Sequence, residues 1–154
     1  MSKANKFKLT LVTSFTFHKN ERLKSRKAIG KIFQGGHSFL AYPLKISWVA
    51  RDLETKPNFP VQFTQSVPKR RFANATQRNR IRRRIREAYR LNKHLINESL
   101  TYEGAPQVAL MVIYIGKEEL PYDQILKATQ RWIKTFLKTV KPTENLSSNQ
   151  PDKH

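Results

Sequence analysis

The chain of 154 residues contains no cysteine, and its acidic residues are scarce, with 11 Asp and Glu against 30 Lys and Arg. The lack of cysteine excludes disulfides, thiolate metal sites and a cysteine nucleophile. A metal-dependent protein nuclease needs carboxylates gathered around its ions. The few acids here form no such cluster, and Glu118 and Glu119 are interpreted as a solvated loop pair. We therefore predict neither a catalytic residue nor a metal ligand on the protein itself.

Long hydrophobic runs are missing as well. The longest, Val108 to Ile115, has eight residues, whereas a membrane-spanning helix needs about 20. The N-terminus resembles a signal peptide only weakly, because Thr10, Thr13 and Thr16 interrupt its apolar stretch and no small-residue cleavage site follows. These observations predict a cytoplasmic protein without membrane contact.

Positive charge is what the chain has in excess, with a formal net charge of +19 at pH 7. Such a polycation predicts a polyanionic partner. Nucleic acid is favoured over an anionic membrane, because clustered Lys and Arg release the counterions that are condensed on phosphates. The four histidines are scattered without the spacing of metal ligands, so we interpret them as structural or surface residues.

The length fits a single domain with loose ends. Residues 1–20 predict a partly ordered N-terminal arm that docks through Phe15 and Phe17. Residues 21–140 carry the periodic apolar patterns of one α/β domain, for which the excess of positive charge predicts a nucleic-acid partner. Residues 141–154, rich in Pro, Asn and Ser, predict a disordered tail.

The first part of the domain predicts a short helix followed by strands. The helix runs from Glu21 to the pair Gly35-Gly36, which we expect to stop it through a positive φ. Strands are expected near residues 39–42, 44–48 and 61–65, because apolar residues alternate there with polar ones. The last two of these strands are expected to pair as antiparallel neighbours.

The second part predicts a long helix, a strand and a final helix. The long helix begins at Asn74 or Thr76 and ends near Asn97. Its packing stripe is expected to be Ile81, Ile85, Ala88, Asn92 and Leu95. The strand 108–115 is apolar throughout, which indicates a central strand buried on both faces. The final helix should bury one face, made of Ile125, Thr129, Trp132, Ile133, Phe136 and Val140. This order predicts one sheet covered by helices on at least one face.

The long helix carries seven arginines between Arg78 and Arg90, against the single acid Glu87. A solvated basic face is the ordinary interpretation of charge on a helix. Here arginine is enriched over lysine and has almost no acid for i, i+4 pairing, while its planar fork suits bidentate phosphate contacts. At about 100° per residue, one group of side chains lies opposite the packing stripe. That group is Asn79, Arg83, Arg86 and Arg90.

The residues 78–83, Arg-Asn-Arg-Ile-Arg-Arg, and their continuation to Arg90 closely resemble the RNR motif of the bacterial ribonuclease P protein component. The segments 66–70 and 21–24, and Ile32-Phe33 before Gly36, resemble the same family. The resemblance covers roughly Phe17 to Leu137. It implies a small α/β (α+β) sandwich with a mixed sheet, the order α-β-β-β-α-β-α and a left-handed βαβ crossover.

The resemblance also implies an accessory role. In this family a catalytic RNA removes the 5′ leader of precursor tRNA, with Mg²⁺ held chiefly by the RNA and no organic cofactor. By motif, the residues expected to contact the catalytic RNA are Arg78, Asn79, Arg80, Arg82, Arg83 and Arg86, with Lys69 and Arg70 close by. Arg90 is added from the helix face.

The family also binds the leader in a cleft between the first helix and the sheet. The matching positions are Phe33 and Ile29 on the helix, with Ser47 or Trp48 on the strand. Aromatic stacking on bases is the physical reason, and core packing is the alternative for Phe33. This sequence departs from the family pattern, because Ile29 stands where an aromatic residue is common and Thr64-Gln65 replaces a usual Gly-Leu.

Three other classes of protein share parts of this pattern. A structural ribosomal protein has the size and charge, but the paired segments 66–70 and 78–90 argue against it. A DNA-binding module needs a few side chains that read base edges, whereas arginines surround most of this helix. A nuclease acting without RNA would cleave precursor tRNA by itself, which one assay decides.

Overall fold

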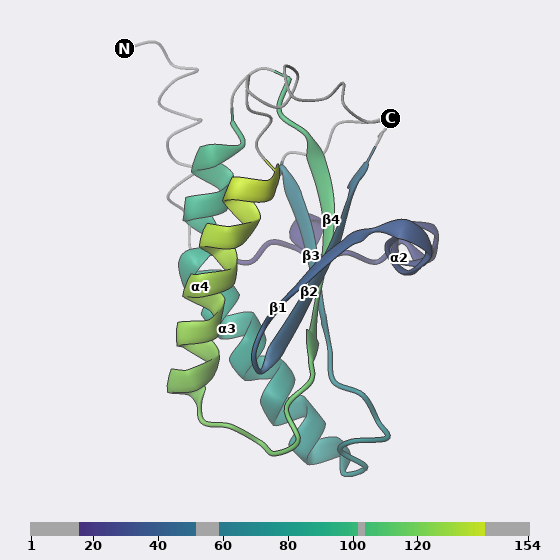
Figure 1. Cartoon of the computed structure of the whole chain (residues 1–154), viewed down its shortest axis with the longest axis vertical. Coiled ribbons are helices and arrows are strands. Elements are labelled where there is room, and N and C mark those ends of the chain that lie inside the picture. The colour runs from purple at the N-terminus through teal and green to yellow at the C-terminus, as the bar shows by residue number, and fades with distance from the viewer. Residues whose placement is uncertain (1–15, 52–58, 102–103, 141–154) are drawn as a thin grey trace, which may run out of the picture.

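The computed structural model describes residues 16–51, 59–101 and 104–140. The predictions made for Phe15, for residues 1–14 and for the tail 141–154 lie outside this range. The elements are η1 Lys19–Glu21, α2 Arg26–Gly35, β1 His37–Ala41, β2 Leu44–Arg51, β3 Val61–Ser66, α3 Ala75–Ser99, β4 Gln107–Tyr114 and α4 Tyr122–Val140 (Figure 1). None of the described helices has the length and apolar character needed to cross a membrane.

The strands form one mixed sheet in the order β1-β2-β4-β3. β1 pairs with β2 and β2 with β4, both antiparallel, whereas β3 pairs with β4 in parallel. The expected antiparallel pairing of β2 with β3 is therefore wrong. β4 is apolar on both faces and takes the central position between them, which leaves β3 at an edge.

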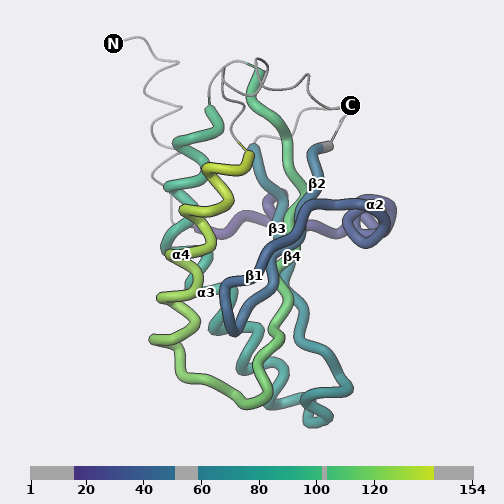
Figure 2. The backbone as a smooth tube through the Cα atoms, in the orientation of Figure 1, coloured from purple at the N-terminus to yellow at the C-terminus, as the bar shows by residue number. Residues whose placement is uncertain are grey.

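Helices cover both faces of this sheet. α3 and α4 lie side by side on one face, and α2 lies on the other (Figures 1 and 2). Strand alternation divides the core accordingly. Leu44 and Ile46 point toward α3 and α4, while Ala109 and Met111 pack with Ile32 of α2. The small α/β sandwich with a mixed sheet is confirmed.

α2 is shorter than expected and ends for another reason. It begins at Arg26, where the Ser25 hydroxyl accepts a hydrogen bond from the Ala28 N–H at 3.1 Å. Gly36, the residue after it, has φ −71°, so the expected positive φ is wrong. A Cβ at Gly36 would lie 2.8 Å from the carbonyl oxygens of Ile32 and Trp48. Glycine is needed there because the helix end meets the backbone of β2.

α3 begins as expected and buries a different stripe in its second half. The Asn74 side chain caps the helix by accepting a hydrogen bond from the Gln77 N–H at 3.1 Å. The expected burial of Leu95 is wrong, because that side chain is 42% exposed. Asn92 is only partly buried. The buried residues beyond Ala88 are Tyr89, Lys93, Ile96 and Asn97.

Lys93 is buried because the N-terminal segment supplies its partner. Its ammonium lies 2.7 Å from the Glu21 carboxylate, and the two side chains are 0% and 1% exposed. It also donates to the Thr16 carbonyl. Beside this pair, Phe17 packs against the core, with its ring centroid 5.9 Å from that of Phe63. The expected docking of the arm through Phe17 is confirmed.

α4 follows the sequence closely. Every residue of its predicted stripe is buried, and Ala128 is buried with them. Its lysines, Lys127, Lys134 and Lys138, are exposed on the other side. The periodicity was sufficient here because the helix packs one continuous apolar face on the sheet and α3.

Candidate nucleic-acid interface

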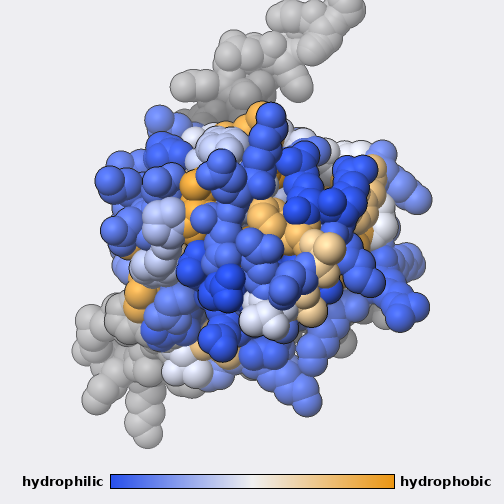
Figure 3. All heavy atoms as spheres, turned by 90° about the horizontal axis from the view of Figure 1, so that it is seen from below, coloured by the Kyte–Doolittle hydropathy of each residue, from blue (hydrophilic) through white to orange (hydrophobic). Residues whose placement is uncertain are grey.

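The arginines gather at one end of the molecule. The first half of α3, the loop 67–74 before it and the loop 115–121 before α4 meet there, at the bottom of Figure 1. Seen from this end, the surface is mostly hydrophilic and encloses a smaller hydrophobic area (Figure 3). The helix therefore presents its cations beside two loops rather than in isolation.

Three of the predicted contact residues on α3 are held by their own helix and its preceding loop. The Arg78 guanidinium donates to the carbonyls of Phe72 and Ala73 at 2.8 and 2.9 Å. Arg82 donates to the side chain of Asn79 at 2.9 Å. Further along, Arg90 pairs with Glu87 at 2.7 Å, and this hydrogen bond is the main cause that lowers the pKa of Glu87. Short-range acceptors thus fix the directions of these side chains.

Two further arginines are tied to a loop far along the chain. Glu119 lies 2.6 Å from Nε of Arg80 and 2.9 Å from Nη1 of Arg84, and Arg84 also donates to the Leu120 carbonyl at 2.9 Å. The Glu119 side chain is only 15% exposed, so the interpretation of Glu119 as a solvated acid is wrong. The hydrogen bond from Arg80 is the main cause that lowers the pKa of Glu119 to about 2. The carboxylate is therefore charged across the physiological pH range.

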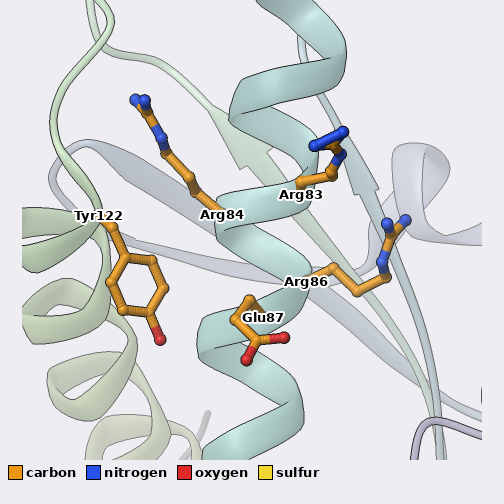
Figure 4. Close-up of a pocket in the computed structure, with 5 residues that line it drawn as sticks. All are labelled: Arg83, Arg84, Arg86, Glu87 and Tyr122. Atoms are coloured by element: carbon orange, nitrogen blue, oxygen red, sulfur yellow. The ribbon is translucent and has the colours of Figure 1, made fainter.

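Arg83 and Arg86 have no hydrogen-bond or ion-pair partner among the residues that the structure describes. Both extend to the same side of α3, away from Tyr122, whereas Arg84 extends toward the segment before α4 (Figure 4). Together with Glu87 and Tyr122 these arginines line an open depression between α3 and α4. Their guanidinium groups are available to an external anion.

Other cations flank this group. Lys69 and Arg70 are exposed in the loop before α3, as the sequence predicted. On the other side, Arg86 lines a second hollow with Arg22 and Lys24 at the edge of β3. The positive surface thus extends from the loop, along α3, to the segment that leads into α2.

The residues expected to form the leader cleft are placed differently from one another. Phe33 is 67% exposed on α2, and Ile29 packs partly against the sheet. Ser47 faces α2, because it pairs with Met111 on the same side of the sheet. Trp48 points to the opposite face, where it is 5% exposed. Its ring lies edge-on to that of Phe136, with 5.4 Å between the ring centroids. Trp48 is therefore withdrawn from the predicted cleft.

Sequence reasoning missed the residues that organise the surface. Arg84, Gln77 and Glu119 form one network, and Arg71 donates to the Ile115 carbonyl at 3.1 Å. The spacing of Arg80 and Arg84, one turn apart, was visible in the sequence. Their shared acid was not, because it belongs to a loop that only the fold brings to α3.

The described part of the chain contains no group of three or more His, Asp or Glu residues that could hold a metal ion. It combines a four-stranded mixed sheet, a long helix rich in arginine and cations on both flanks of that helix. Fold and surface define the class of the molecule as a small basic α/β protein with an exposed arginine helix.

Comparison with known proteins gives the family. The Ribonuclease P family profile matches residues 17–137. The ribonuclease P protein component of Porphyromonas gingivalis is 38% identical over 114 residues, which cover 73% of this chain and 80% of that protein. The component of Chlorobaculum tepidum is 34% identical over 105 residues, covering 66% and 68%. The chain belongs to the ribonuclease P protein family, whose members are protein components of a ribonucleoprotein endoribonuclease of tRNA processing.

Solved structures agree on the fold. The RNase P protein of Staphylococcus aureus superposes with a TM-score of 0.57 at 21% identity, covering 78% of this chain and 96% of that one. The protein of Thermotoga maritima gives a TM-score of 0.55 at 19% identity, with 79% and 98% covered. At these identities the likeness supports the shared architecture alone.

Proposed function

We propose that this protein is the subunit that binds the catalytic RNA of ribonuclease P through the arginine surface of α3. The observation that carries the proposal is the arrangement of this surface, in which some arginines are held by internal acceptors while Arg83 and Arg86 are left to an external anion. Arginine presented in fixed directions suits phosphate recognition better than a mobile lysine cluster. The predicted contact residues are Arg78, Asn79, Arg80, Arg82, Arg83, Arg86, Arg90, Lys69 and Arg70.

The cleavage chemistry is proposed to reside in the RNA. No acidic cluster is present in the described residues to hold catalytic metal ions, which supports placing Mg²⁺ chiefly on the RNA. The protein's contribution is electrostatic, because neutralising phosphates allows catalytic RNA and precursor tRNA to approach each other. The product is the mature 5′ end of the tRNA.

The 5′ leader of precursor tRNA is proposed to lie against α2 and the sheet. Phe33 exposes most of its ring there, and Ile29 and Ser47 lie on the same side of the sheet. A stacked base typically gains about 1 to 3 kcal/mol from an aromatic ring. Only Phe33 is aromatic among these three, so we expect this surface to depend strongly on one stacking contact.

The test is reconstitution with purified components. Labelled precursor tRNA and Mg²⁺ are incubated with the protein alone, with the catalytic RNA alone, and with both. We expect cleavage at the 5′ end to require the RNA and to be stimulated by the protein at low Mg²⁺. Robust cleavage by the protein alone would overturn the assignment of the chemistry to RNA.

A pair of variants locates the binding surface. Replacing Arg83 and Arg86 by Ala should weaken binding of the catalytic RNA and reduce the slope of log affinity against log salt by about 2, since each lost phosphate contact removes about 1. Replacing Lys134 and Lys138 by Ala removes the same charge from the exposed face of α4. Equal losses in both variants would mean that only the total charge matters.

A further inference from the structure

Glu119, in the loop before α4, contacts three side chains of α3. Its carboxylate accepts hydrogen bonds from Arg80 Nε at 2.6 Å and Nη2 at 2.7 Å, and from Gln77 Nε2 at 3.2 Å. Arg84 Nη1 lies 2.9 Å from the same carboxylate. The three partners lie at positions i, i+3 and i+7 of α3, which places them along one side of the helix. One acid therefore organises a row of side chains on the predicted RNA-binding helix.

The loop that carries Glu119 is already held by other contacts. The Tyr114 hydroxyl donates to the Glu118 carbonyl and accepts from the Leu120 N–H at 3.0 Å. The Ile115 carbonyl accepts from Arg71, and the Leu120 carbonyl accepts from Arg84. These bonds fix the backbone on both sides of Glu119 without its carboxylate. The carboxylate itself is thus free to act on the arginines.

The Arg80 guanidinium is held and still presented to solvent. Its Nε and Nη2 face Glu119, while Nη1 has no partner in the described parts of the chain, and the side chain is 48% exposed. The Arg84 side chain is 27% exposed, and its Nη1 lies 2.9 Å from both the Glu119 carboxylate and the Leu120 carbonyl. A guanidinium fixed in this manner loses little rotamer freedom when it meets a phosphate.

We propose that Glu119 is a positioning residue of the RNA-binding surface, which orients Arg80 and Arg84 for phosphates of the catalytic RNA. This inference rests on the proposed function. It assigns to an acid a favourable effect on the binding of a polyanion. General electrostatics demands the opposite, because removing a carboxylate makes a basic surface more positive and strengthens RNA binding. The two effects therefore differ in sign.

The experiment compares Glu119→Gln with Glu118→Gln in the full-length protein. Glu118 is its neighbour in the same loop, and its side chain is exposed. Both variants lose one negative charge, so the net charge of each rises by one. Dissociation constants for the catalytic RNA are measured at several salt concentrations, well below the melting temperature of each variant. We expect Glu118→Gln to bind as tightly as the parent or slightly tighter. Glu119→Gln should bind about three- to tenfold more weakly, as expected when two ordered side chains become free.

A second comparison tests the route through Arg80. In an Arg80→Ala background, Glu119→Gln should add less than half of the loss it causes in the parent protein. A Glu119→Gln protein that binds as tightly as Glu118→Gln, or an undiminished loss in the Arg80→Ala background, overturns the inference. If Glu119→Gln does not fold, Arg80→Lys replaces it, because lysine keeps the charge and loses the bidentate contact with Glu119. An Arg80→Lys protein that binds the RNA as tightly as the parent also overturns the inference. Failure of the parent protein to bind the RNA refutes the proposed function instead.

Discussion

Replacing Lys93 by Met should destabilise the fold by about 3 to 5 kcal/mol, because it strands a buried carboxylate. Lys93 and Glu21 are 0% and 1% exposed, with 2.7 Å between their charged groups. In the variant, the Glu21 carboxylate keeps one hydrogen bond, from the His18 N–H at 2.8 Å. Methionine has nearly the volume of the lysine stem, so the loss reflects an uncompensated charge rather than a cavity.

The assay is urea unfolding at pH 7, followed by circular dichroism, for the two single variants and the double variant. Glu21→Leu should also lose several kcal/mol, because it leaves the Lys93 ammonium buried with the Thr16 carbonyl. The double variant should lose much less than the sum, since neither charge remains. Lys127→Met, at an exposed position of α4, is the control and should change stability by less than about 0.5 kcal/mol. A loss below about 1 kcal/mol for Lys93→Met, or additive losses, would refute the reasoning.

Three further predictions use other parts of the fold. Gly36→Ala should destabilise by about 1 to 3 kcal/mol, because its Cβ meets two carbonyl oxygens at 2.8 Å, while Gly30→Ala, with nothing within 4 Å, should stabilise α2 by about 0.5 to 1 kcal/mol; thermal melts compare the pair. The stability lost in Glu119→Gln should be about 1 kcal/mol at pH 7. This difference in stability should vanish as the pH falls from 4.5 toward 2, since the pKa of Glu119 is lowered to about 2 in the folded protein. A difference between parent and variant that stays constant over this pH range would contradict the prediction. Phe33→Ala should leave the melting temperature nearly unchanged, because the ring is 67% exposed, but should weaken binding of precursor tRNA relative to mature tRNA; equal effects on both RNAs would remove Phe33 from the leader surface.

Periodicity predicted the elements better than their pairing. The stripe of α4 and the central burial of β4 follow from apolar spacing alone. The neighbours of β3 do not follow from apolar spacing. A later strand, β4, lies between β2 and β3 and prevents these two from pairing directly. β4 inserts there, since its two apolar faces need cover on both sides. The short sequence distance between β2 and β3 favours a hairpin, but the burial of β4 between them excludes it.

The stripe of α3 shows a second limit of the sequence. The 3, 4 spacing of apolar residues puts Leu95 in the predicted stripe, whereas a lysine such as Lys93 is ordinarily exposed. The buried face of α3 instead includes Lys93 and Ile96, because Glu21, 72 positions earlier, offers Lys93 a buried partner. The expected docking of the N-terminal arm through Phe17 does not by itself indicate that Glu21 meets Lys93, because nothing in either segment pairs the two residues.

The candidate site was predicted as a set of cations and found as an arrangement. The RNR segment and its flanking loop predicted where positive charge gathers, and the structure places the loop and the beginning of α3 together at one end of the molecule. Its order comes from acceptors that charge counting treats as irrelevant: the carbonyls before α3, Asn79, Glu87 and above all Glu119.

Internal acceptors resolve a conflict that the sequence poses. Seven arginines within thirteen positions of one helix repel one another in the free protein, and that repulsion opposes folding. Pairing them all with acids would remove the repulsion together with the attraction for RNA. Here carbonyl and amide oxygens hold Arg78 and Arg82 without neutralising them, while one acid serves both Arg80 and Arg84. The helix is thereby ordered at the expense of few charges, which leaves its field available to a polyanion.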